Sequence, residues 1–358
     1  MGIVKEIRTK VERGERISRE DALTLLEEAD PLTLGQLAHL VRRRLNPEPL
    51  VTFVIDRNIN YTNVCVNRCR FCAFWRAPGD PDAFVLSHQE VFNKIEELLH
   101  LGGTSILIQG GLNPELGLDH ITGLFSAIKE RFPALHIHGL SPPEVWYYAE
   151  KEGIGLKETL QRLKDSGLGS IPGGGAEVLS DRVRSRISPK KIDSAKWLKV
   201  MEEAHRAGLK SSATMMFGSV DTWEDVVEHL AKVRDLQDKT GGFTAFIPWT
   251  FQPPNTELQD LAPKSGVDYL QVLATSRIFL DNVPHLQASW VTQGIKMGQV
   301  ALFFGADDLG STMIEENVVA AAGATYRTSV DEMVRVIKDA GFIPAQRTTL
   351  YQVIKRIS

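Results

Sequence analysis

The stretch VTFVIDRNINYTNVCVNRCRFC, residues 51–72, predicts both the fold and the chemistry of this 358-residue chain. Its first half, Val51 to Thr62, is rich in β-branched and aromatic residues, which is typical of a buried strand. Its second half, Cys65 to Cys72, holds every cysteine of the chain. The sequence therefore predicts a strand that leads directly into a loop carrying three thiols.

Strand and helix patterns alternate on the carboxyl-terminal side of this stretch, whereas residues 1–48 read as helices, with Ser18 as an N-cap. A helix capped by Ser87 follows the cysteines. Strands are expected at 104–111, 134–142, 169–177, 210–218, 244–252, 285–290 and 299–307. Helices are expected around 119–132, 155–167, 193–207, 222–239 and 329–341.

This alternation predicts βαβ units around a parallel sheet, which is an α/β fold. About six to eight such units suit a (β/α) barrel of the TIM type, partial or complete. An open doubly wound sheet is the alternative, but no dinucleotide-binding glycine fingerprint follows the first strand. We expect an N-terminal helical segment at 1–48, the barrel at 49–310, and a C-terminal helical extension at 311–358.

The composition excludes several classes of protein. A net charge of −4 gives no basic footprint for nucleic acid. No apolar run approaches the ~18 residues of a membrane span, and the first residues lack the apolar core of a signal peptide. An odd number of cysteines excludes a complete disulfide framework. We expect a cytoplasmic protein with reduced thiols and with no nucleic-acid or membrane partner.

Cys65, Cys69 and Cys72 form a C-x3-C-x2-C pattern just after the first barrel strand. Loops after barrel strands lie at the carboxyl-terminal face, where barrels keep their active sites. A structural zinc site would need a fourth ligand at finger-like spacing, and the nearest histidines, His88 and His100, fall in the next helix. The pattern predicts a metal centre that is open on one side, with a three-cysteine zinc site or three structural thiols as alternatives.

This cysteine spacing resembles that of the radical S-adenosylmethionine (SAM) superfamily. The resemblance implies a [4Fe-4S] cluster on the three cysteines, whose open iron chelates the methionine moiety of SAM. Reductive cleavage of SAM then yields a 5′-deoxyadenosyl radical. It further implies that Phe71 lies beside the adenine, and that a one-electron reductant such as flavodoxin or ferredoxin is a partner.

Two glycine-rich strand ends fit the same resemblance. Gln109, Gly110 and Gly111 stand where the family carries a Gly-Gly-Glu-like segment for the methionine amine. No acid follows directly here, so we expect backbone carbonyls to contact the amine. In GGGAE, residues 173–177, Gly174 permits close approach of a ligand, and Glu177 is expected to accept hydrogen bonds from a ribose or an ammonium group. Ordinary turn chemistry is the alternative for both segments.

Longer segments at 56–76, 171–191, 246–256 and 305–323 resemble one subgroup, the futalosine-pathway menaquinone enzymes and the deazaflavin-precursor synthases. Within it the chain is most similar to the enzymes that cyclise dehypoxanthine futalosine, and aminofutalosine synthases are the alternative. The resemblance implies abstraction of the ribose C4′ hydrogen, addition of the carbon radical to the aromatic ring, and loss of one electron and one proton. A non-catalytic iron–sulfur or zinc protein is the alternative from another class.

Candidate catalytic residues follow from this chemistry. His138, near the end of the strand expected at 134–142, is expected to contact the substrate or to act as a base, with a core histidine as the alternative. Asp307 and Glu315, which stand beside Asp308 and Glu316, are expected to bind ribose hydroxyls or to take the final proton. An ordinary helix start is the alternative for these acids.

The sequence also offers residues for the substrate carboxylate and for the pocket wall. An arginine presents a planar fork to a carboxylate. The arginines considered are Arg57, Arg76 and Arg277. Residues expected to line the pocket at the ends of strands are Thr214, Met216, Trp249 and Gln252.

Overall fold

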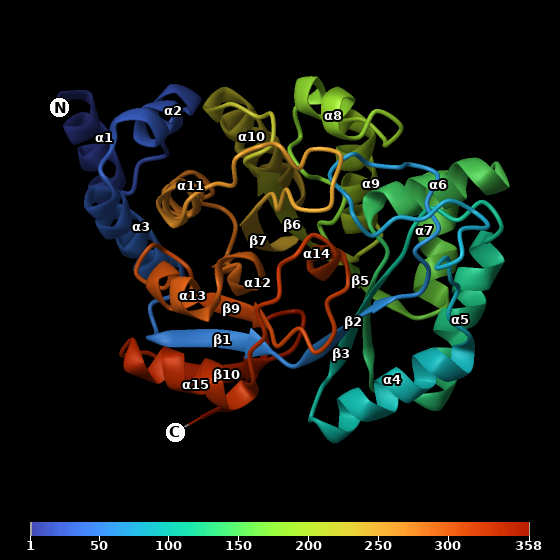
Figure 1. Ribbon diagram of the computed structural model, residues 1–358. Coiled ribbons are helices and arrows are strands. Elements are labelled where there is room, and N and C mark those ends of the chain that lie inside the picture. Colours follow the sequence, from blue (N-terminus) through green and yellow to red (C-terminus); the bar gives the residue numbers. More distant parts are fainter. Residues whose placement is uncertain (1, 358) are drawn as a thin grey trace.

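The centre of the molecule is a curled sheet of seven parallel strands, seen in a computed structural model that describes residues 2–357 (Figure 1). The strands are β2 (Asp56–Asn60), β3 (Ser105–Gln109), β4 (His136–Gly139), β5 (Leu168–Ile171), β6 (Lys210–Phe217), β7 (Phe243–Thr250) and β8 (His285–Leu286). They lie side by side in sequence order, which is the arrangement that repeated βα units produce. The fold is therefore the α/β partial barrel that the sequence predicts.

Helices form the layer outside this sheet (Figure 1). They are α4 (His88–His100), α5 (Leu118–Arg131), α6 (Pro142–Glu152), α7 (Leu156–Asp165), α8 (Asp181–Ile187), α9 (Ser194–Arg206), α10 (Trp223–Thr240) and α11 (Gly266–Phe279). The predicted cap of α4 is confirmed, because the Ser87 hydroxyl accepts from Glu90 N while the Glu90 carboxylate accepts from Ser87 N. The helix then buries Val91, Ile95 and Leu98 on one face.

The stretch expected as one first strand is two strands that belong to different sheets. β1 (Leu50–Val54) lies in a second sheet of order β11-β10-β1-β9, and the chain passes into β2 after Ile55. β1 pairs with β9 (Asp308–Ser311) and β10 (Ile343–Arg347), and β10 pairs in turn with β11 (Val353–Arg356). A parallel bridge between Gln287 and Asp308 joins the end of β8 to β9. The small sheet thus spans the gap between the two edges of the barrel.

The N-terminal segment is helical, as predicted, and packs on the side of the barrel (Figure 1). Its helices are α1 (Gly2–Arg13), α2 (Arg19–Glu28) and α3 (Pro31–Leu45). α2 packs on α10 and α11, and α3 packs on α11. Arg42 of α3 donates to the carbonyl oxygens of Ala306 at 3.0 Å and Leu50 at 2.9 Å, which ties the segment to the beginnings of β1 and β9.

One strand expected from the sequence is wrong. Residues 299–307 continue the short helix α13 (Ile295–Ala301) into a turn, in which Gly305 adopts a φ of 97°. A short apolar run fits a helix end as well as a strand, and periodicity alone does not separate them. The strand β9 therefore starts at Asp308, one residue after the predicted strand ends.

The C-terminal extension contains the expected helix and also strands that the sequence pattern did not reveal. The helix is α15 (Val330–Asp339), capped by Ser329. β10 and β11 follow it and extend the small sheet next to β1. Two further short helices precede α15, namely α12 (Trp290–Gln293) and α14 (Val318–Ala321).

Within residues 2–357, no helix is both long and apolar enough to cross a membrane.

Candidate active site

Two adjoining cavities lie at the barrel. We call the first, of about 220 Å³, the thiol cavity, because Cys65, Cys69 and Cys72 line it. The second, of about 260 Å³, is called the inner cavity, and the side chains of β2 to β7 line much of it. Residues common to both linings are Gln109, Gly174, Gly175, Glu177, Trp249 and Val318. A molecule bound at the thiols therefore reaches the inner cavity directly.

The cysteine loop follows β2 and is held by backbone hydrogen bonds to distant segments. Cys65 N donates to Arg76 O at 3.0 Å, and Arg70 N donates to Ile187 O at 2.9 Å. Within the loop, Cys72 N donates to Cys69 O at 3.0 Å, which makes a tight turn between the last two cysteines. These bonds fix the three thiols on one wall of the thiol cavity.

The donor set fits an iron–sulfur cluster. All three thiols are free, and Cys69 is buried. Burial raises the pKa of Cys69 to about 12, because a thiolate is poorly solvated there. Among residues 2–357, no group of three or more His, Cys, Asp or Glu side chains is arranged to hold a single metal ion. Three thiolates around an open cavity suit a cluster that leaves one iron free for another ligand.

The glycine pair at the end of β3 lies directly under the cysteine loop. A Cβ atom on Gly111 would lie 2.8 Å from Cys65 Cβ and would also overlap Val64 O. A Cβ atom on Gly110 would lie 2.7 Å from the ring of Tyr61. Packing against the loop thus explains why both positions lack a side chain. Gln109, the preceding residue, faces both cavities, as expected for a cofactor contact.

An acid that the sequence reading missed lies beside this glycine pair. Glu144 of α6 lines the thiol cavity, and its Oε1 accepts from Gly110 N at 2.9 Å and from Tyr61 OH at 2.8 Å. Burial raises the pKa of Glu144, and Ser141 N donates to its Oε2 at 2.7 Å. No acid follows Gly111 in sequence, but α6, the helix after β4, brings an acid beside the glycine pair. Its signal was the capping-box spacing of Ser141 and Glu144.

Glu177 lies where the two cavities meet, and one of its carboxylate oxygens lacks a hydrogen bond. Its backbone is held at a φ of 43°, and Lys191 Nζ donates to its Oε1 at 2.8 Å. Its Oε2 is buried, lies 3.8 Å from Arg184 Nη1 and has no hydrogen-bond partner. Lys191 Nζ also lies 5.1 Å from the centroid of the Phe71 ring. Because a buried carboxylate oxygen requires a donor, this corner fits a ligand with a hydroxyl or ammonium group. Lys191 was not singled out, although it closes the segment 171–191.

The inner cavity combines aromatic walls with several titratable groups. His138, Thr214 and Trp249 line it, as the sequence predicts, whereas Met216 and Gln252 are not in its wall. Burial lowers the pKa of His138 to about 3, so its imidazole is neutral at neutral pH. Asn58 Nδ2 donates to Glu316 Oε2 at 3.0 Å.

Two carboxyl groups in this wall have raised pKa values, which sequence reasoning did not anticipate. Burial raises the pKa of Asp56 to about 6, although the Ser311 hydroxyl donates to it. Burial also raises the pKa of Glu316.

The inner cavity has a second large aromatic side chain in its wall beside Trp249, that of Trp290.

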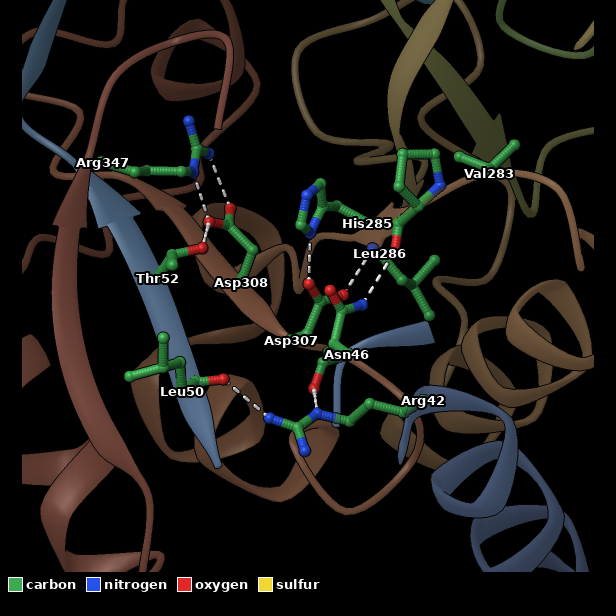
Figure 2. A network of polar contacts seen from close by, with 12 residues as sticks. Arg42, Asn46, Leu50, Thr52, Val283, His285, Leu286, Asp307, Asp308 and Arg347 are labelled. Carbon is green, nitrogen blue, oxygen red and sulfur yellow. Dashed lines mark hydrogen bonds and ion pairs between the residues drawn. The ribbon is translucent and has the colours of Figure 1, made fainter. Parts of the chain in front are cut away.

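Asp307 does not line either cavity, contrary to expectation. Its Oδ2 lies 2.6 Å from His285 Nδ1, and its Oδ1 accepts from Leu286 N at 2.8 Å (Figure 2). Its neighbour Asp308 accepts from Thr52 and, through both oxygens, from Arg347. Because β9 begins at Asp308, these acids stand at the start of a strand and not at its carboxyl end. They join β1, β8, β9 and β10.

Glu315 also lies outside the cavities. It accepts from Lys94 Nζ at 2.7 Å and from Arg57 Nε at 2.9 Å, in an ion-pair cluster between α4, β2 and the segment after β9. The adjacent Glu316 lines the inner cavity in its place. The expected acid is thus displaced by one residue.

The three candidate arginines have other partners. Arg57 pairs with Glu315, Arg76 Nε lies 2.5 Å from Asp82, and Arg277 Nη2 donates to Leu280 O at 3.0 Å. None of these three lines the inner cavity. The arginine that does so is Arg347 of β10, which belongs to a strand that the sequence pattern did not reveal.

Comparison with protein families supports this site. Residues 59–233 match the model of the radical SAM superfamily. Residues 240–358 match the model described as the CofH/MqnC C-terminal region. The first match contains the cysteine loop and the strands from β3 to β6, and the second contains β7 to β11. Together they cover the wall of the thiol cavity and most of the wall of the inner cavity.

Individual proteins match over nearly the full chain. A cyclic dehypoxanthine futalosine synthase of Halalkalibacterium halodurans is 47% identical over 96% of this chain and 92% of its own length. The enzyme of that name in Streptomyces coelicolor is 44% identical, over 95% and 86%. A 5-amino-6-(D-ribitylamino)uracil–L-tyrosine 4-hydroxyphenyl transferase of Methanopyrus kandleri is 41% identical, over 91% and 90%.

Solved structures share the fold at low identity. The [FeFe]-hydrogenase maturase HydG from Carboxydothermus hydrogenoformans superposes with a TM-score of 0.75 at 19% identity, over 97% of this chain and 80% of its own. Methylornithine synthase (PylB) gives 0.75 at 18%, over 95% and 97%. The family models and the relatives at 41–47% identity agree on one assignment. This chain belongs to the radical SAM superfamily, in the family that contains the cyclic dehypoxanthine futalosine synthases.

Proposed function

We propose that this chain is a radical SAM enzyme that cyclises dehypoxanthine futalosine in menaquinone biosynthesis. The observation that carries the proposal is the direct junction of a three-thiol cavity with a second cavity walled by Trp249 and Trp290. The relatives named as cyclic dehypoxanthine futalosine synthases, at 44–47% identity over nearly the whole chain, support the choice of substrate.

Three thiolates, those of Cys65, Cys69 and Cys72, would hold a [4Fe-4S] cluster in the thiol cavity. When bound, the cluster and SAM supply a 5′-deoxyadenosyl radical, which abstracts a hydrogen atom from the substrate. Phe71, which lines this cavity, would contact the adenine. Glu177 Oε2, which has no hydrogen-bond partner, would accept from a ribose hydroxyl or an ammonium group.

Further residues set the SAM pocket. Glu144 accepts a hydrogen bond from Gly110 N and so fixes the end of β3, which would lie against the methionine moiety of SAM. Gln109 and Gly174 line the passage between the two cavities. Lys191 holds Glu177 and brings a cation to the thiol cavity, where a carboxylate of SAM would be bound.

The inner cavity would enclose the substrate. Abstraction of the ribose C4′ hydrogen leaves a carbon radical that adds to the aromatic ring, and loss of one electron and one proton restores aromaticity. The indole rings of Trp249 and Trp290 exclude water from this space, which protects the radical. His138, which lines this cavity and is neutral, would take the proton.

We also propose an acidic one-electron carrier, flavodoxin or ferredoxin, as the reductant. Arg68 and Arg70, which stand between the cysteines, are both exposed on the loop. Positive charge beside the thiols would attract an acidic carrier to the site of electron transfer.

An anaerobic assay tests the proposal. Iron-reconstituted protein is mixed with SAM, dithionite and dehypoxanthine futalosine, and the products are separated and weighed by mass spectrometry. We expect 5′-deoxyadenosine together with a product two hydrogens lighter than the substrate. A parallel reaction contains 5-amino-6-(D-ribitylamino)uracil and tyrosine. Product in the parallel reaction alone would assign this chain to the transferase activity of its archaeal relatives instead.

A further inference from the structure

Two histidines and a serine form a continuous hydrogen-bonded chain behind the inner cavity. Ser170 Oγ lies 2.7 Å from His138 Nδ1 and 2.7 Å from His136 Nε2. The histidines stand two residues apart on β4, so their side chains share a face of the sheet. Ser170 is the β5 partner of His138. His138 lines the inner cavity, whereas Ser170 and His136 are outside the lining.

The hydroxyl dictates how protons are arranged in this chain. A serine hydroxyl has one proton to donate, so one imidazole must donate to Ser170 Oγ while the other accepts from it. In one arrangement His138 Nδ1 carries the proton and His138 Nε2 is a free base. In the other, His136 Nε2 donates to Ser170, Ser170 donates to His138 Nδ1, and His138 Nε2 carries the proton.

We propose that His138, Ser170 and His136 form a proton relay that removes the proton lost by the substrate in the final step. This inference rests on the proposed function. His138 Nε2 accepts the substrate proton, His138 Nδ1 passes its proton to Ser170 Oγ, and the Ser170 hydroxyl proton passes to His136 Nε2. His136 Nδ1 then releases a proton to solvent, since His136 is only partly buried at the beginning of β4.

The step balances without leaving charge in the relay. One proton enters at His138 Nε2, one leaves from His136 Nδ1, and both imidazoles end neutral with their tautomers exchanged. The electron that accompanies the proton leaves to a one-electron acceptor of the iron–sulfur class. Passing a proton on in this way avoids an imidazolium in an enclosed cavity, where an unpaired charge is costly.

The surroundings favour passage of the proton over its storage. Burial lowers the pKa of His138 to about 3 and that of His136 to about 4. Arg347 near His138 and Lys129 near His136 further disfavour the cationic imidazoles. A group that must only carry a proton gains from being neutral before and after the transfer.

Variants at the two positions outside the cavity test the relay. Ser170→Ala removes the hydroxyl, and His136→Gln keeps a polar side chain that cannot pass a proton on. We expect 5′-deoxyadenosine to form in both variants while cyclised product falls about 100-fold, the usual scale of a lost acid–base contribution. Fluorescence quenching by the substrate should give an unchanged dissociation constant, because neither residue lines the cavity.

Ser211→Ala is the matched control. Ser211 Oγ lies 2.7 Å from His205 Nε2, which reproduces the serine–histidine contact one strand away and outside both cavities. This variant should retain the wild-type ratio of 5′-deoxyadenosine to product. Imidazole 15N spectra of the reconstituted protein supply a readout that does not depend on turnover. Ser170→Ala should shift the signals of His136 and His138, and Ser211→Ala that of His205.

The outcomes separate the relay from the proposed function. The relay alone would be overturned if the wild type forms cyclised product and the ratio of 5′-deoxyadenosine to product is unchanged in Ser170→Ala, His136→Gln and Ser211→Ala. Absence of cyclised product from the wild type would overturn the proposed function and, with it, this inference. If Ser170→Ala shows no thermal unfolding transition and is therefore not folded, the ratio of 5′-deoxyadenosine to product in His136→Gln tests the relay.

Discussion

Cys69 is the most buried of the three cysteines, with an exposure of 5% for the residue. A thiol in this position resists ionisation unless a cation stabilises the thiolate. We expect Cys69→Ala to lose iron on reconstitution and to form no 5′-deoxyadenosine, measured by iron and sulfide content and by chromatography. Iron content and SAM cleavage at wild-type levels in this variant would contradict the cluster assignment.

Glu177 allows a test of SAM binding at a single atom. In Glu177→Gln, an amide nitrogen, which cannot accept, replaces Oε2, the oxygen that has no hydrogen-bond partner. A hydrogen bond to a charged group contributes about 1.5–3 kcal/mol, so SAM should bind the reconstituted variant roughly 10- to 100-fold more weakly. Equilibrium dialysis measures the change. Glu203→Gln is the control, because Glu203 also accepts from a lysine but lies on the outer helix α9.

His229 gives a pH dependence to the stability of the fold. Its Nδ1 accepts from Leu179 N at 3.0 Å, and burial lowers the pKa of His229 to about 3. In the unfolded chain the pKa is about 6.5, so between these values only the unfolded chain is protonated. Unfolding then takes up a proton, and the free energy of unfolding falls as the pH decreases.

His229→Gln should therefore flatten this dependence. Between about pH 6 and pH 4, the slope of the unfolding free energy should decrease by about 1.4 kcal/mol per pH unit relative to the wild type. Urea titrations at a series of pH values measure it. The exposed His100→Gln variant should keep the wild-type slope, and an unchanged slope in His229→Gln would show that this histidine is protonated in the folded state.

The residues that could be predicted from sequence are those with a local signature. The cysteines have a characteristic spacing. Gln109 ends β3, and Gly174 and Glu177 follow the end of β5, at the face that a barrel uses for its active site. Asp307 and Glu315 were misplaced because their partners are distant in sequence. Asp307 contacts His285, 22 residues away, and Glu315 contacts Arg57, 258 residues away. No local pattern reveals that such acids are already paired.

The contact between β3 and the cysteine loop is a test at the scale of elements. A methyl group on Gly111 would overlap Val64 O and approach Cys65 Cβ to 2.8 Å, so Gly111→Ala must push the loop away from the strand. We expect reduced iron incorporation and a lower unfolding temperature. The matched control is Gly123→Ala in α5, where a Cβ atom meets nothing within 4 Å. This substitution should stabilise the helix by up to about 1 kcal/mol and leave the iron content unchanged.

Helices and strands were predictable where the spacing of apolar residues and the length of the segment indicated the same kind of element. Strands β3 to β7 alternate with long helices, and each is a short apolar run between turn residues. The division of 51–62 into β1 and β2 was not predictable, because the two strands are separated by Ile55 alone and no turn signal shows that different sheets receive them. β10 was not predictable from local sequence, because its partner β1 lies almost 300 residues earlier.

The whole molecule is completed by its C-terminal extension. β10 pairs with β1, and Arg347, Thr349 and Tyr351 form part of the wall of the inner cavity. The ring of Tyr351 lies between the His285 ring, with centroids 3.9 Å apart, and the Arg347 guanidinium, 3.8 Å away. Residues from both ends of the chain thus close the cavity that the barrel strands leave open.

The ion pair of Arg347 and Asp308 is the connection on which this closure depends. Both side chains are buried, at 4% and 0% exposure, and Arg347 donates to both oxygens of Asp308. Removing one partner leaves a buried charge unpaired, which costs about 3–5 kcal/mol. We expect Arg347→Met to lower the free energy of unfolding by that amount in urea titrations, and to weaken substrate binding to the inner cavity.

Arg356→Met is the matched control for this prediction, because it removes an arginine from the same sheet. Arg356 pairs with Glu48 on the surface, where both side chains are 58% exposed. Such a pair contributes about 0–1 kcal/mol, so the control should stay within that range. Asp308→Asn in the Arg347→Met background should recover part of the loss, since it removes the unpaired charge. Equal stabilities of Arg347→Met and Arg356→Met would show that the extension is held by the β10–β1 pairing alone.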